Sequence, residues 1–320
     1  MKEYGGYIEF EKYYNQEYHK DALALNTGTN CLVFLLRKKR IKKVYLPYFM
    51  CPTAGKACKE NNIETEFYHI DESFRPIFKT QMQEGEYIYV VNYYGQIDNE
   101  EISRFKAVYG NIIIDNVQAF FQLPLPGIDT IYSCRKFFGV PDGAYLYTDL
   151  EHETPDIEQD YSFARLRHLA GRFETTGTTF LEQYRKNEKE LLKSPVLKMS
   201  KCTSNLLRGI DYKSVLNIRN INFQYLYDRL QERNGLALKL IEGAYMYPFF
   251  VPNGWYIRKK LCDIHIYIPL LWPDVVEKCR ADSVEYKLAQ NILPLPVDQR
   301  YNIKDMDYIY HRVLELLRDH

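Results

Sequence analysis

Short apolar runs alternate with helix-like segments along the first half of the chain. The runs are rich in β-branched and aromatic residues and are apolar on both faces, a pattern typical of buried strands. They span residues 42–49, 63–70, 86–95, 111–116, 129–134 and 143–148. Strands that are buried on both faces and separated by helices assemble into parallel sheets that helices cover on either side. We therefore expect an α/β fold whose large domain, residues 20–200, holds a mostly parallel sheet sandwiched by helices.

The second half of the chain has longer and more highly charged helical segments. Helical spacing covers residues 178–193, 215–233 and 303–320, the last with apolar positions at 306, 309, 313, 316 and 317. The block 254–273 predicts one or two strands. We expect a smaller α+β C-terminal domain over residues 201–320, joined by the N-terminal residues 1–19.

The charge balance bears on the class of partner. The 320 residues include 42 Lys and Arg and 42 Asp and Glu, so no net charge attracts nucleic acid or an anionic membrane. The N-terminus has no apolar signal core and no window approaches about 18 consecutive apolar residues, which disfavours secretion and membrane insertion. The seven cysteines form no C-x-x-C pair, which argues against a zinc site or a disulfide framework. We expect a cytoplasmic protein with no metal, nucleic acid or membrane partner.

A Thr-Gly-Thr-Asn turn precedes the first helical run. Gly28, Thr29 and Asn30 come directly before an apolar stretch that begins at Cys31 and ends in the basic run 37–43. A helix N-terminus presents free backbone N–H groups and the positive end of the helix dipole, which favours a phosphate; an ordinary N-cap is the alternative. The chain has neither G-x-G-x-x-G nor a Walker lysine, which disfavours dinucleotide and nucleoside triphosphate sites. The basic run falls in the last turn of the predicted helix, where cations complement the dipole.

Two further signals follow predicted strands. Asp115 lies at the end of the run 111–116 with no basic residue beside it, and Gln118 follows three positions later. A carboxylate at the carboxyl end of a strand is a ligand-binding position in α/β proteins, with a helix N-cap as the alternative. Ser133 and Lys136 form a Ser-x-x-Lys after the next strand. A serine nucleophile of the penicillin-recognising class would need Ser-Asp-Asn and Lys-Thr-Gly elements, which the chain lacks.

Pyridoxal phosphate (PLP) explains these signals together. This cofactor needs an anchor for its phosphate, a partner for its pyridinium nitrogen and a lysine for a Schiff base. The Thr-Gly-Thr turn, Asp115 and Lys136 would supply them in that order. Lys136 would then act as general acid and base once an incoming amine displaces it, and Ser133 would donate a hydrogen bond to the phosphate.

Five segments resemble, in the same order, the DegT/DnrJ/StrS family of sugar aminotransferases, which are fold type I PLP enzymes. These segments are LNTGTNCLVFLL, KKVYLPYFMCPTA, YIYVVNYYGQIDNEEI, IIIDNVQAFF and SCRKFFGVPDGAYL. The resemblance covers residues 20–148, whereas only scattered patterns match after residue 150. It implies that Lys136 is the catalytic Schiff-base lysine and that Gln118 lies near the phenolic oxygen of the cofactor. The implied cofactor-binding set is Gly28, Thr29, Asn30, Cys51, Asn92, Asp115, Gln118, Ser133 and Lys136.

The resemblance also implies roles for two less familiar residues. Cys51 stands about where members carry the residue that stacks on the cofactor ring, and Asn92 would face the cofactor or the substrate. Candidates for substrate contact in the second half of the chain are Arg258, His265, Trp272 and Arg300. An arginine would hold a carboxylate through two hydrogen bonds, and the alternatives are surface cations and packed aromatic rings.

The implied activity is amino transfer. Members that dehydrate their substrate replace the lysine, so Lys136 indicates an aminotransferase. The resemblance implies ping-pong transfer of an amino group from glutamate or glutamine to a nucleotide-linked keto-sugar, for surface polysaccharide synthesis, in a homodimer. Two alternatives stay open: a catalytically degenerate member that binds PLP or a sugar nucleotide in a regulatory role, and an α/β nucleotide-binding protein that uses the turn for another phosphate.

Overall fold

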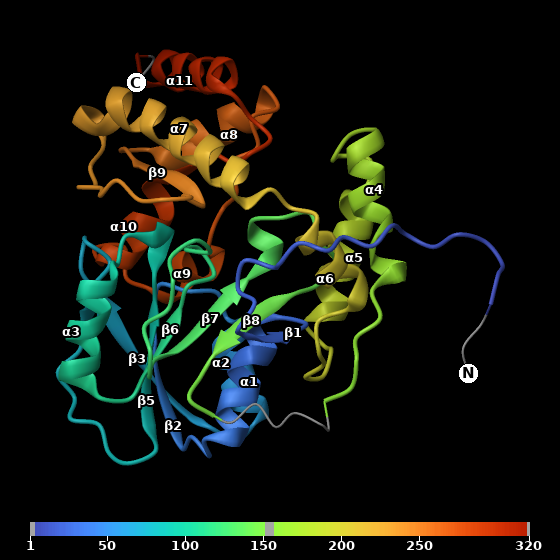
Figure 1. The fold of residues 1–320 in the computed structure, drawn as a ribbon. Coiled ribbons are helices and arrows are strands. Elements are labelled where there is room, and N and C mark those ends of the chain that lie inside the picture. Colours follow the sequence, from blue (N-terminus) through green and yellow to red (C-terminus); the bar gives the residue numbers. More distant parts are fainter. Residues whose placement is uncertain (1–3, 151–156, 319–320) are drawn as a thin grey trace.

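The computed structural model describes residues 4–150 and 157–318. Figure 1 shows a large sheet with helices around it and, at the other end of the molecule, a smaller and mainly helical C-terminal unit. The strands of the large sheet are β1 (Leu23–Leu25), β2 (Lys43–Pro47), β3 (Glu64–Ile70), β4 (Pro76–Ile77), β5 (Glu86–Val91), β6 (Ile112–Asp115), β7 (Asp129–Ser133) and β8 (Ala144–Tyr147). A two-stranded sheet consists of β9 (Met246–Phe250) and β10 (Ile292–Pro296).

The helices follow the same division. Those before residue 210 are α1 (Gly28–Lys38), α2 (Thr53–Glu60), α3 (Asn99–Tyr109), α4 (Arg167–Glu174), α5 (Leu181–Leu191) and α6 (Lys201–Arg208). Those after it are α7 (Tyr212–Leu230), α8 (Gly254–Asp263), α9 (Pro273–Lys278), α10 (Val284–Asn291) and α11 (Ile303–Arg318). In Figure 1, α7, α8 and α11 gather around β9, whereas α1, α2 and α3 lie against the large sheet.

The large sheet is mostly parallel, so the predicted α/β class is confirmed. Its order is β1-β8-β7-β6-β5-β2-β3-β4. Strands β7, β6, β5, β2 and β3 are parallel, while β8, β1 and β4 pair antiparallel at the two sides. Each of the six predicted runs contains one strand. Strands β1 and β4 lie outside those runs because three and two residues are too few to show a period.

The middle of the sheet places a carboxylate at its edge. Every residue of β6 is buried, and its neighbours β5 and β7 are almost as fully buried. The register pairs Val91 with Asp115 and Asp115 with Ile131. Because β5, β6 and β7 are parallel, their carboxyl ends meet at one edge, where ligands bind in α/β sheets.

Helix α1 begins at the predicted turn. Thr27 is its N-cap, and the Thr27 hydroxyl accepts a hydrogen bond from the Asn30 N–H at 3.1 Å. Residues 30–36 are buried, and the last turn carries Arg37 and Lys38, as the sequence predicts. Further along the basic run, Lys39 pairs with Asp129 and Asp149, and Lys43 with Glu64 and Glu66. The run therefore serves the fold through a helix end and local ion pairs.

The C-terminal unit has its own apolar core. Phe223, Leu226 and Leu230 of α7 pack there with β9, β10 and α11. The predicted closing helix is confirmed, since α11 buries Met306, Ile309 and Val313.

The strands predicted within residues 254–273 are wrong. Residues 254–263 form α8, in which Ile257 and Leu261 lie four positions apart and are buried on one face. The partner strand of β9 comes instead from Ile292–Pro296. The β-branched and aromatic residues of the block predict strands by composition, whereas the four-residue spacing decides the structure.

An aromatic cluster connects the N-terminal segment to the large sheet. His19 is buried there, with Nε2 donating to the Phe120 carbonyl at 2.8 Å and Nδ1 accepting from the Tyr147 hydroxyl at 3.2 Å. Met199 and Leu207 pack in the same cluster, on either side of residue 200. The domain boundary at residue 200 stays a prediction.

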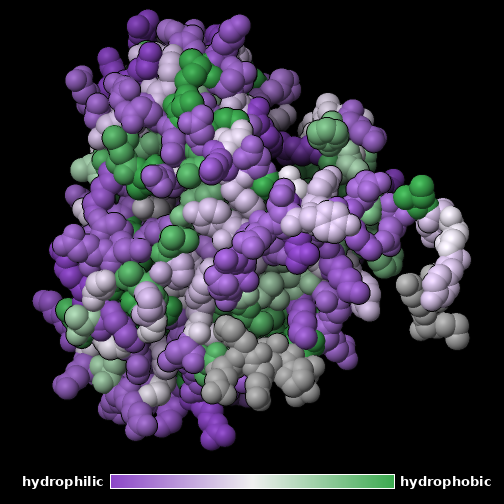
Figure 2. All heavy atoms as spheres, in the orientation of Figure 1, coloured by the Kyte–Doolittle hydropathy of each residue, from purple (hydrophilic) through white to green (hydrophobic). Residues whose placement is uncertain are grey.

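The surface is mixed in character. Figure 2 shows polar side chains over most of the visible face, with apolar side chains in small separate groups. Within residues 4–150 and 157–318, no helix is long and apolar enough to cross a membrane.

Candidate active site

Three loops meet at the carboxyl ends of β6 and β7. The turn at the start of α1 packs against the other two, because a Cβ atom added to Gly28 would lie 3.6 Å from Ile131 and 3.7 Å from Val117. The chain turns back after Asp115, and after β7 it forms the short 3₁₀ helix η2 (Cys134–Lys136). The structure thus gathers the Thr-Gly-Thr turn, the strand-end carboxylate and the lysine at one edge of the sheet.

Asp115 is a buried carboxylate, 8% exposed. Its Oδ2 accepts from the Tyr89 hydroxyl at 2.8 Å and its Oδ1 from the Val117 N–H at 3.0 Å. Burial raises the pKa of Asp115, while the charge of Lys136 and the two hydrogen bonds oppose the rise. A carboxylate has about four acceptor positions, so these contacts leave capacity for another donor. The helix N-cap alternative does not apply, because a turn follows Asp115.

Lys136 has an exposed side chain and forms no ion pair with any residue that the structure describes. Its Nζ lies 5.7 Å from the centroid of the Tyr245 ring. The preceding Arg135 is neutralised by Glu188 of α5. The Lys136 amine is close enough to Asp115 to stabilise the charged carboxylate. Because none of the described residues holds it in a salt bridge, the amine is available for covalent chemistry.

The predicted phosphate turn is only partly open. Gly28 and Thr29 are half-buried in the first turn of α1, where backbone N–H groups have no partner inside the helix. Asn30 is used by the fold: its N–H binds Thr27, and its side chain donates to the Pro195 carbonyl at 2.7 Å and to Asn26 at 2.9 Å. An anion at this turn would therefore meet the N–H groups of Gly28 and Thr29 rather than the Asn30 amide.

The oxygen of the Gln118 side chain is engaged within the protein. Its Oε1 accepts from the Tyr94 N–H at 2.8 Å, which holds a residue of positive φ, 53°. The predicted contact of Gln118 with the phenolic oxygen stays a prediction.

The Asn92 side chain is likewise committed. Its amide nitrogen donates to the Ile97 carbonyl and to Asn116, both at 3.0 Å, and its oxygen accepts from the Ile97 N–H at 2.9 Å. These bonds fix the loop after β5. A direct contact of Asn92 with the cofactor or substrate stays a prediction.

Ser133 and Cys51 are the remaining predicted cofactor-binding residues. Ser133 ends β7, half-buried opposite Ala144 of β8. Cys51 is exposed, and its sulfur lies 2.9 Å from the Thr53 hydroxyl. Burial, then the Asp115 carboxylate and, more weakly, Cys51 raise the pKa of Tyr89 well above its usual range. The Cys51 thiol is therefore close enough to Tyr89, the donor to Asp115, to influence it electrostatically.

Cys51 also lines a cavity of about 940 Å³. The cavity lies between α2 and β3, and its walls include Tyr48, Lys56, Phe67 and Lys278. It is larger than a cavity of about 330 Å³ beside β1. The structure thus brings Cys51 to a wide opening next to the loop after β2.

Three residues near the site lie outside the predicted set: Tyr89, Arg219 and Tyr245. Tyr89 could have been found from strand alignment, since it shares a face with Val91, which pairs with Asp115. Arg219 stands four residues before Phe223 on the buried face of α7, and a charge on an apolar helix stripe indicates a specific partner. Tyr245 gives no sequence signal of this kind.

Two substrate candidates from the second half of the chain are engaged elsewhere. Arg300 holds Asp298 through two hydrogen bonds, at 2.6 and 2.8 Å. Trp272 is buried, with its ring centroid 4.5 Å from that of Phe49 in the loop after β2. Arg300 is therefore a cation paired with a neighbouring residue, and Trp272 is a packed aromatic ring. Both agree with the alternatives to substrate contact.

The other two candidates are less engaged. His265 lies with Nδ1 3.1 Å from the Tyr267 hydroxyl, at a positive φ of 64°. The Nε of Arg258 is buried and has no hydrogen-bond partner among the described residues. Substrate contact by either residue stays a prediction.

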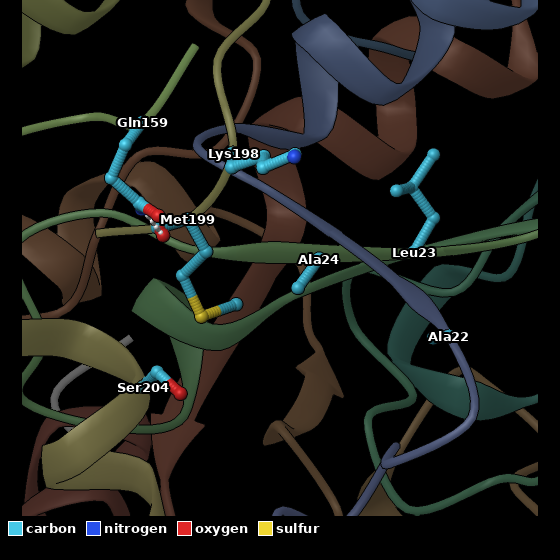
Figure 3. Close-up of a pocket in the computed structure, with 7 residues that line it drawn as sticks. All are labelled: Ala22, Leu23, Ala24, Gln159, Lys198, Met199 and Ser204. Carbon is cyan, nitrogen blue, oxygen red and sulfur yellow. Dashed lines mark hydrogen bonds between the residues drawn. The ribbon is translucent and has the colours of Figure 1, made fainter. Parts of the chain in front are cut away.

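A second cavity, of about 330 Å³, lies beside the edge strand β1. Figure 3 shows its lining, where the Gln159 side chain donates to the Met199 carbonyl. None of the predicted site residues lines it. Across residues 4–150 and 157–318, no group of three His, Cys, Asp or Glu side chains is arranged to hold a metal ion.

Solved structures share the architecture around this site. A DegT DnrJ EryC1 StrS aminotransferase from Brucella abortus superposes with a TM-score of 0.63 at 14% identity, over 92% of this chain and 85% of that one. The chain has the fold of these aminotransferases. For ntda from Bacillus subtilis, with bound cofactor PMP, the TM-score is 0.65 at 15% identity, over 93% and 73% of the two chains. For DesV from S. venezuelae, in complex with a ketimine intermediate, it is 0.61 at 16% identity, over 92% and 84%.

Sequence comparison alone finds no relative. No family model matches the chain, and no curated protein matches it. The predicted DegT/DnrJ/StrS resemblance and fold type I are confirmed at the level of the fold.

The residues present fit PLP in three respects. Asp115 is a buried carboxylate with spare acceptor capacity, suited to a protonated ring nitrogen. Lys136 is an amine with no ion pair to any residue in 4–150 or 157–318, and the N–H groups of Gly28 and Thr29 leave the first turn of α1 open to a phosphate. No aromatic ring stands at Cys51, so ring stacking from that position is not part of the fit.

Proposed function

We propose that this chain is a PLP-dependent aminotransferase that moves an amino group from glutamate or glutamine to a nucleotide-linked keto-sugar, as a cytoplasmic homodimer in surface polysaccharide synthesis. The observation that carries the proposal is the proximity of a buried carboxylate, Asp115 at the end of β6, to the amine of Lys136 just after β7, which forms no ion pair among the described residues. The fold supports it, since structures of this fold include enzymes described as sugar aminotransferases.

Each residue has a definite task in this reaction. When bound, PLP supplies an electron sink for the carbon that carries the amino group. Asp115 would keep a proton on the ring nitrogen, and the N–H groups of Gly28 and Thr29 would bind the phosphate. Lys136 Nζ would take the proton from the α-carbon of the donor and return a proton to the acceptor carbon. The same amine would serve both half-reactions, which is the requirement of a ping-pong mechanism.

The test compares two lysines. Purified protein supplied with PLP should turn yellow, and addition of glutamate or glutamine should change its visible spectrum and release the matching 2-oxo acid. Lys136→Ala should lower the rate of that release by about 1,000-fold or more, because both general acid–base and covalent catalysis are lost. Lys186→Ala, which removes an exposed lysine of α5 paired with Glu190, should leave the rate unchanged.

Other outcomes separate the alternatives. A protein that stays colourless with PLP, or a Lys136→Ala variant as active as its parent, would contradict the proposal. Uptake of PLP at Lys136 without release of a 2-oxo acid from any amino donor would indicate a degenerate member, which the cysteine at position 51 favours. A phosphate ligand that binds equally well after Lys136→Ala would indicate a nucleotide-binding protein.

A further inference from the structure

The residue that follows the reactive lysine is held from the C-terminal unit. The Phe137 carbonyl accepts from Arg219 Nη2 at 3.3 Å and from Gln299 Nε2 at 2.8 Å. The Arg219 guanidinium also lies 4.6 Å from the centroid of the Phe137 ring. Arg219 belongs to α7 and Gln299 follows β10, so two separate segments of the C-terminal unit converge on one peptide beside Lys136.

Arg219 is a buried cation held mainly by neutral groups. It is 1% exposed, and besides Phe137 it donates to the Ala244 carbonyl at 2.7 Å and to Gln299 Oε1 at 2.9 Å. The carboxylate that acts on it through space, Asp298, is hydrogen-bonded to Arg300. Burial lowers the pKa of Arg219 to about 10. Because an apolar side chain would fill this position at lower cost, the guanidinium indicates a requirement for its directed donors.

The second carbonyl that Arg219 binds, that of Ala244, precedes a residue whose ring lies near Lys136. Tyr245 follows Ala244, and its ring lies 5.6 Å from the Phe137 ring and 5.7 Å from Lys136 Nζ. A single guanidinium therefore joins the carbonyl of the residue after Lys136 to the segment whose aromatic ring lies near the Lys136 amine. Arg219 is buried and each of its three guanidinium nitrogens donates within the protein, which argues against Arg219 as a direct contact for a substrate carboxylate.

We infer that Arg219 is a positioning residue, through which the C-terminal unit fixes the backbone and the aromatic wall that aim the Lys136 amine. The inference rests on the proposed function in one respect, namely that Lys136 is the reactive amine. Arg219 raises the rate at which this amine reacts.

The test uses two arginines of the same helix. Arg219→Lys keeps the charge but cannot hold two carbonyls and cover a flat ring at once. Arg229→Lys is the matched control, since Arg229 is exposed on α7 and stacks on Tyr225 at 3.7 Å. In cofactor-free protein, amide hydrogen exchange should be about tenfold faster over residues 134–138 in Arg219→Lys, the effect of losing one charge-assisted hydrogen bond, and unchanged in Arg229→Lys.

The second readout follows the amine itself. After addition of PLP, samples are reduced with borohydride at successive times, and the modified peptide is quantified by mass spectrometry. The rate of modification at Lys136 should fall about tenfold in Arg219→Lys and stay at the parent value in Arg229→Lys. A purely structural role would instead raise exchange along the whole of α7 and leave the rate at Lys136 unchanged in protein that remains folded.

Two results would overturn the inference. One is a folded Arg219→Lys protein whose exchange over residues 134–138 and whose rate at Lys136 equal those of the parent. The other is exchange that rises throughout the C-terminal unit with no local excess. If Arg219→Lys does not fold, Gln299→Ala, which removes the other donor to the Phe137 carbonyl, must show the same two effects. A parent protein that never modifies Lys136 would contradict the proposed function, and the exchange measurement would still decide whether Arg219 holds the segment.

Discussion

Two buried aspartates stand on either side of Lys136 in the sequence, and the protein holds them differently. Asp142 has Oδ2 bound by the Ser200 N–H at 2.8 Å and Oδ1 bound by the hydroxyls of Ser200, at 2.7 Å, and Thr203. Asp115 receives one hydroxyl and one N–H, and it feels the charge of Lys136. Burial raises the pKa of both carboxylates. Burial alone therefore does not distinguish the two carboxylates, whereas they differ in acceptor capacity, since Asp142 receives three hydrogen bonds and Asp115 two.

The backbone around Asp142 supports this distinction. The next residue, Gly143, has a φ of 110°, and a Cβ there would lie 2.9 Å from Thr203 and 3.3 Å from Cys134. The turn is thus closely packed against the segment that binds Asp142, with no room for a ligand at Gly143. Asp142 joins two parts of the fold, while Asp115 lies at the edge of the sheet where the three loops meet.

The largest expected effect is that of Asp115→Asn on catalysis. An amide cannot hold the proton on the ring nitrogen as a carboxylate does, so the rate of amino transfer should fall about 1,000-fold. The free energy of unfolding should change by less than about 1 kcal/mol, because a buried charge is replaced by a neutral group of the same shape. Steady-state kinetics and urea titration measure the two effects. Activity retained within tenfold would remove Asp115 from the site.

Asp142→Asn should show the opposite profile. Its amide nitrogen would face the donors of Ser200 and Thr203, so the free energy of unfolding should fall by about 3 kcal/mol. In protein that is still folded, the rate at which Lys136 reacts with PLP should stay within about twofold of the parent rate. Thr203→Ala, which removes one donor, is the matched smaller change. A loss of reactivity without a loss of stability would erase the contrast between the two aspartates.

His19 extends the comparison to a buried histidine. Burial lowers its pKa to about 4, with the Phe120 carbonyl opposing the shift. Between pH 6.5 and about 4, His19 is protonated in the unfolded chain and neutral in the folded protein. The free energy of unfolding is therefore highest above pH 6.5 as far as His19 is concerned, and it falls as the pH falls through this range. The difference from 6.5 corresponds to about 3 kcal/mol. In His19→Gln, the unfolding free energy should vary less over this range in urea titrations. An unchanged pH dependence would show that another group is responsible.

Tyr89→Phe should have the smallest effect and sharpen the description of Asp115. The Tyr89 hydroxyl favours the charged carboxylate, so its removal should raise the pKa of Asp115 further. We expect about fivefold weaker PLP binding, the value of one hydrogen bond, and loss of binding on acidification at a higher pH than in the parent. Tyr87→Phe, on the same strand with a half-buried ring, is the control. A pH profile identical to that of the parent would show that Tyr89 does not tune Asp115.

Much of the sheet could be predicted because buried parallel strands form long apolar runs. The position of Asp115 at the end of β6 and that of Lys136 after β7 follow from the same pattern. The short antiparallel edge strands could not be predicted, since two or three residues carry no period. The strands predicted over residues 254–273 are wrong because composition favours strands there while the buried Ile257 and Leu261 follow a helical spacing.

The site was harder to predict in its side chains than in its backbone. The sequence places Asn30, Asn92 and Gln118 near strand and helix ends. It does not reveal that their side-chain amides form hydrogen bonds with other parts of the chain. Arg219 reaches Phe137 from 82 residues away, across two separately packed cores. Such contacts depend on how the units dock, which no local pattern along the chain encodes.

The central claim is that the amine of Lys136 is the reactive group of a PLP site completed by Asp115. The most direct test is borohydride reduction of the protein after incubation with PLP, followed by digestion and mass spectrometric mapping of the modified lysine. The account predicts one modified position, Lys136, with loss of the visible absorption on reduction. Modification of another lysine, or of none, would contradict it.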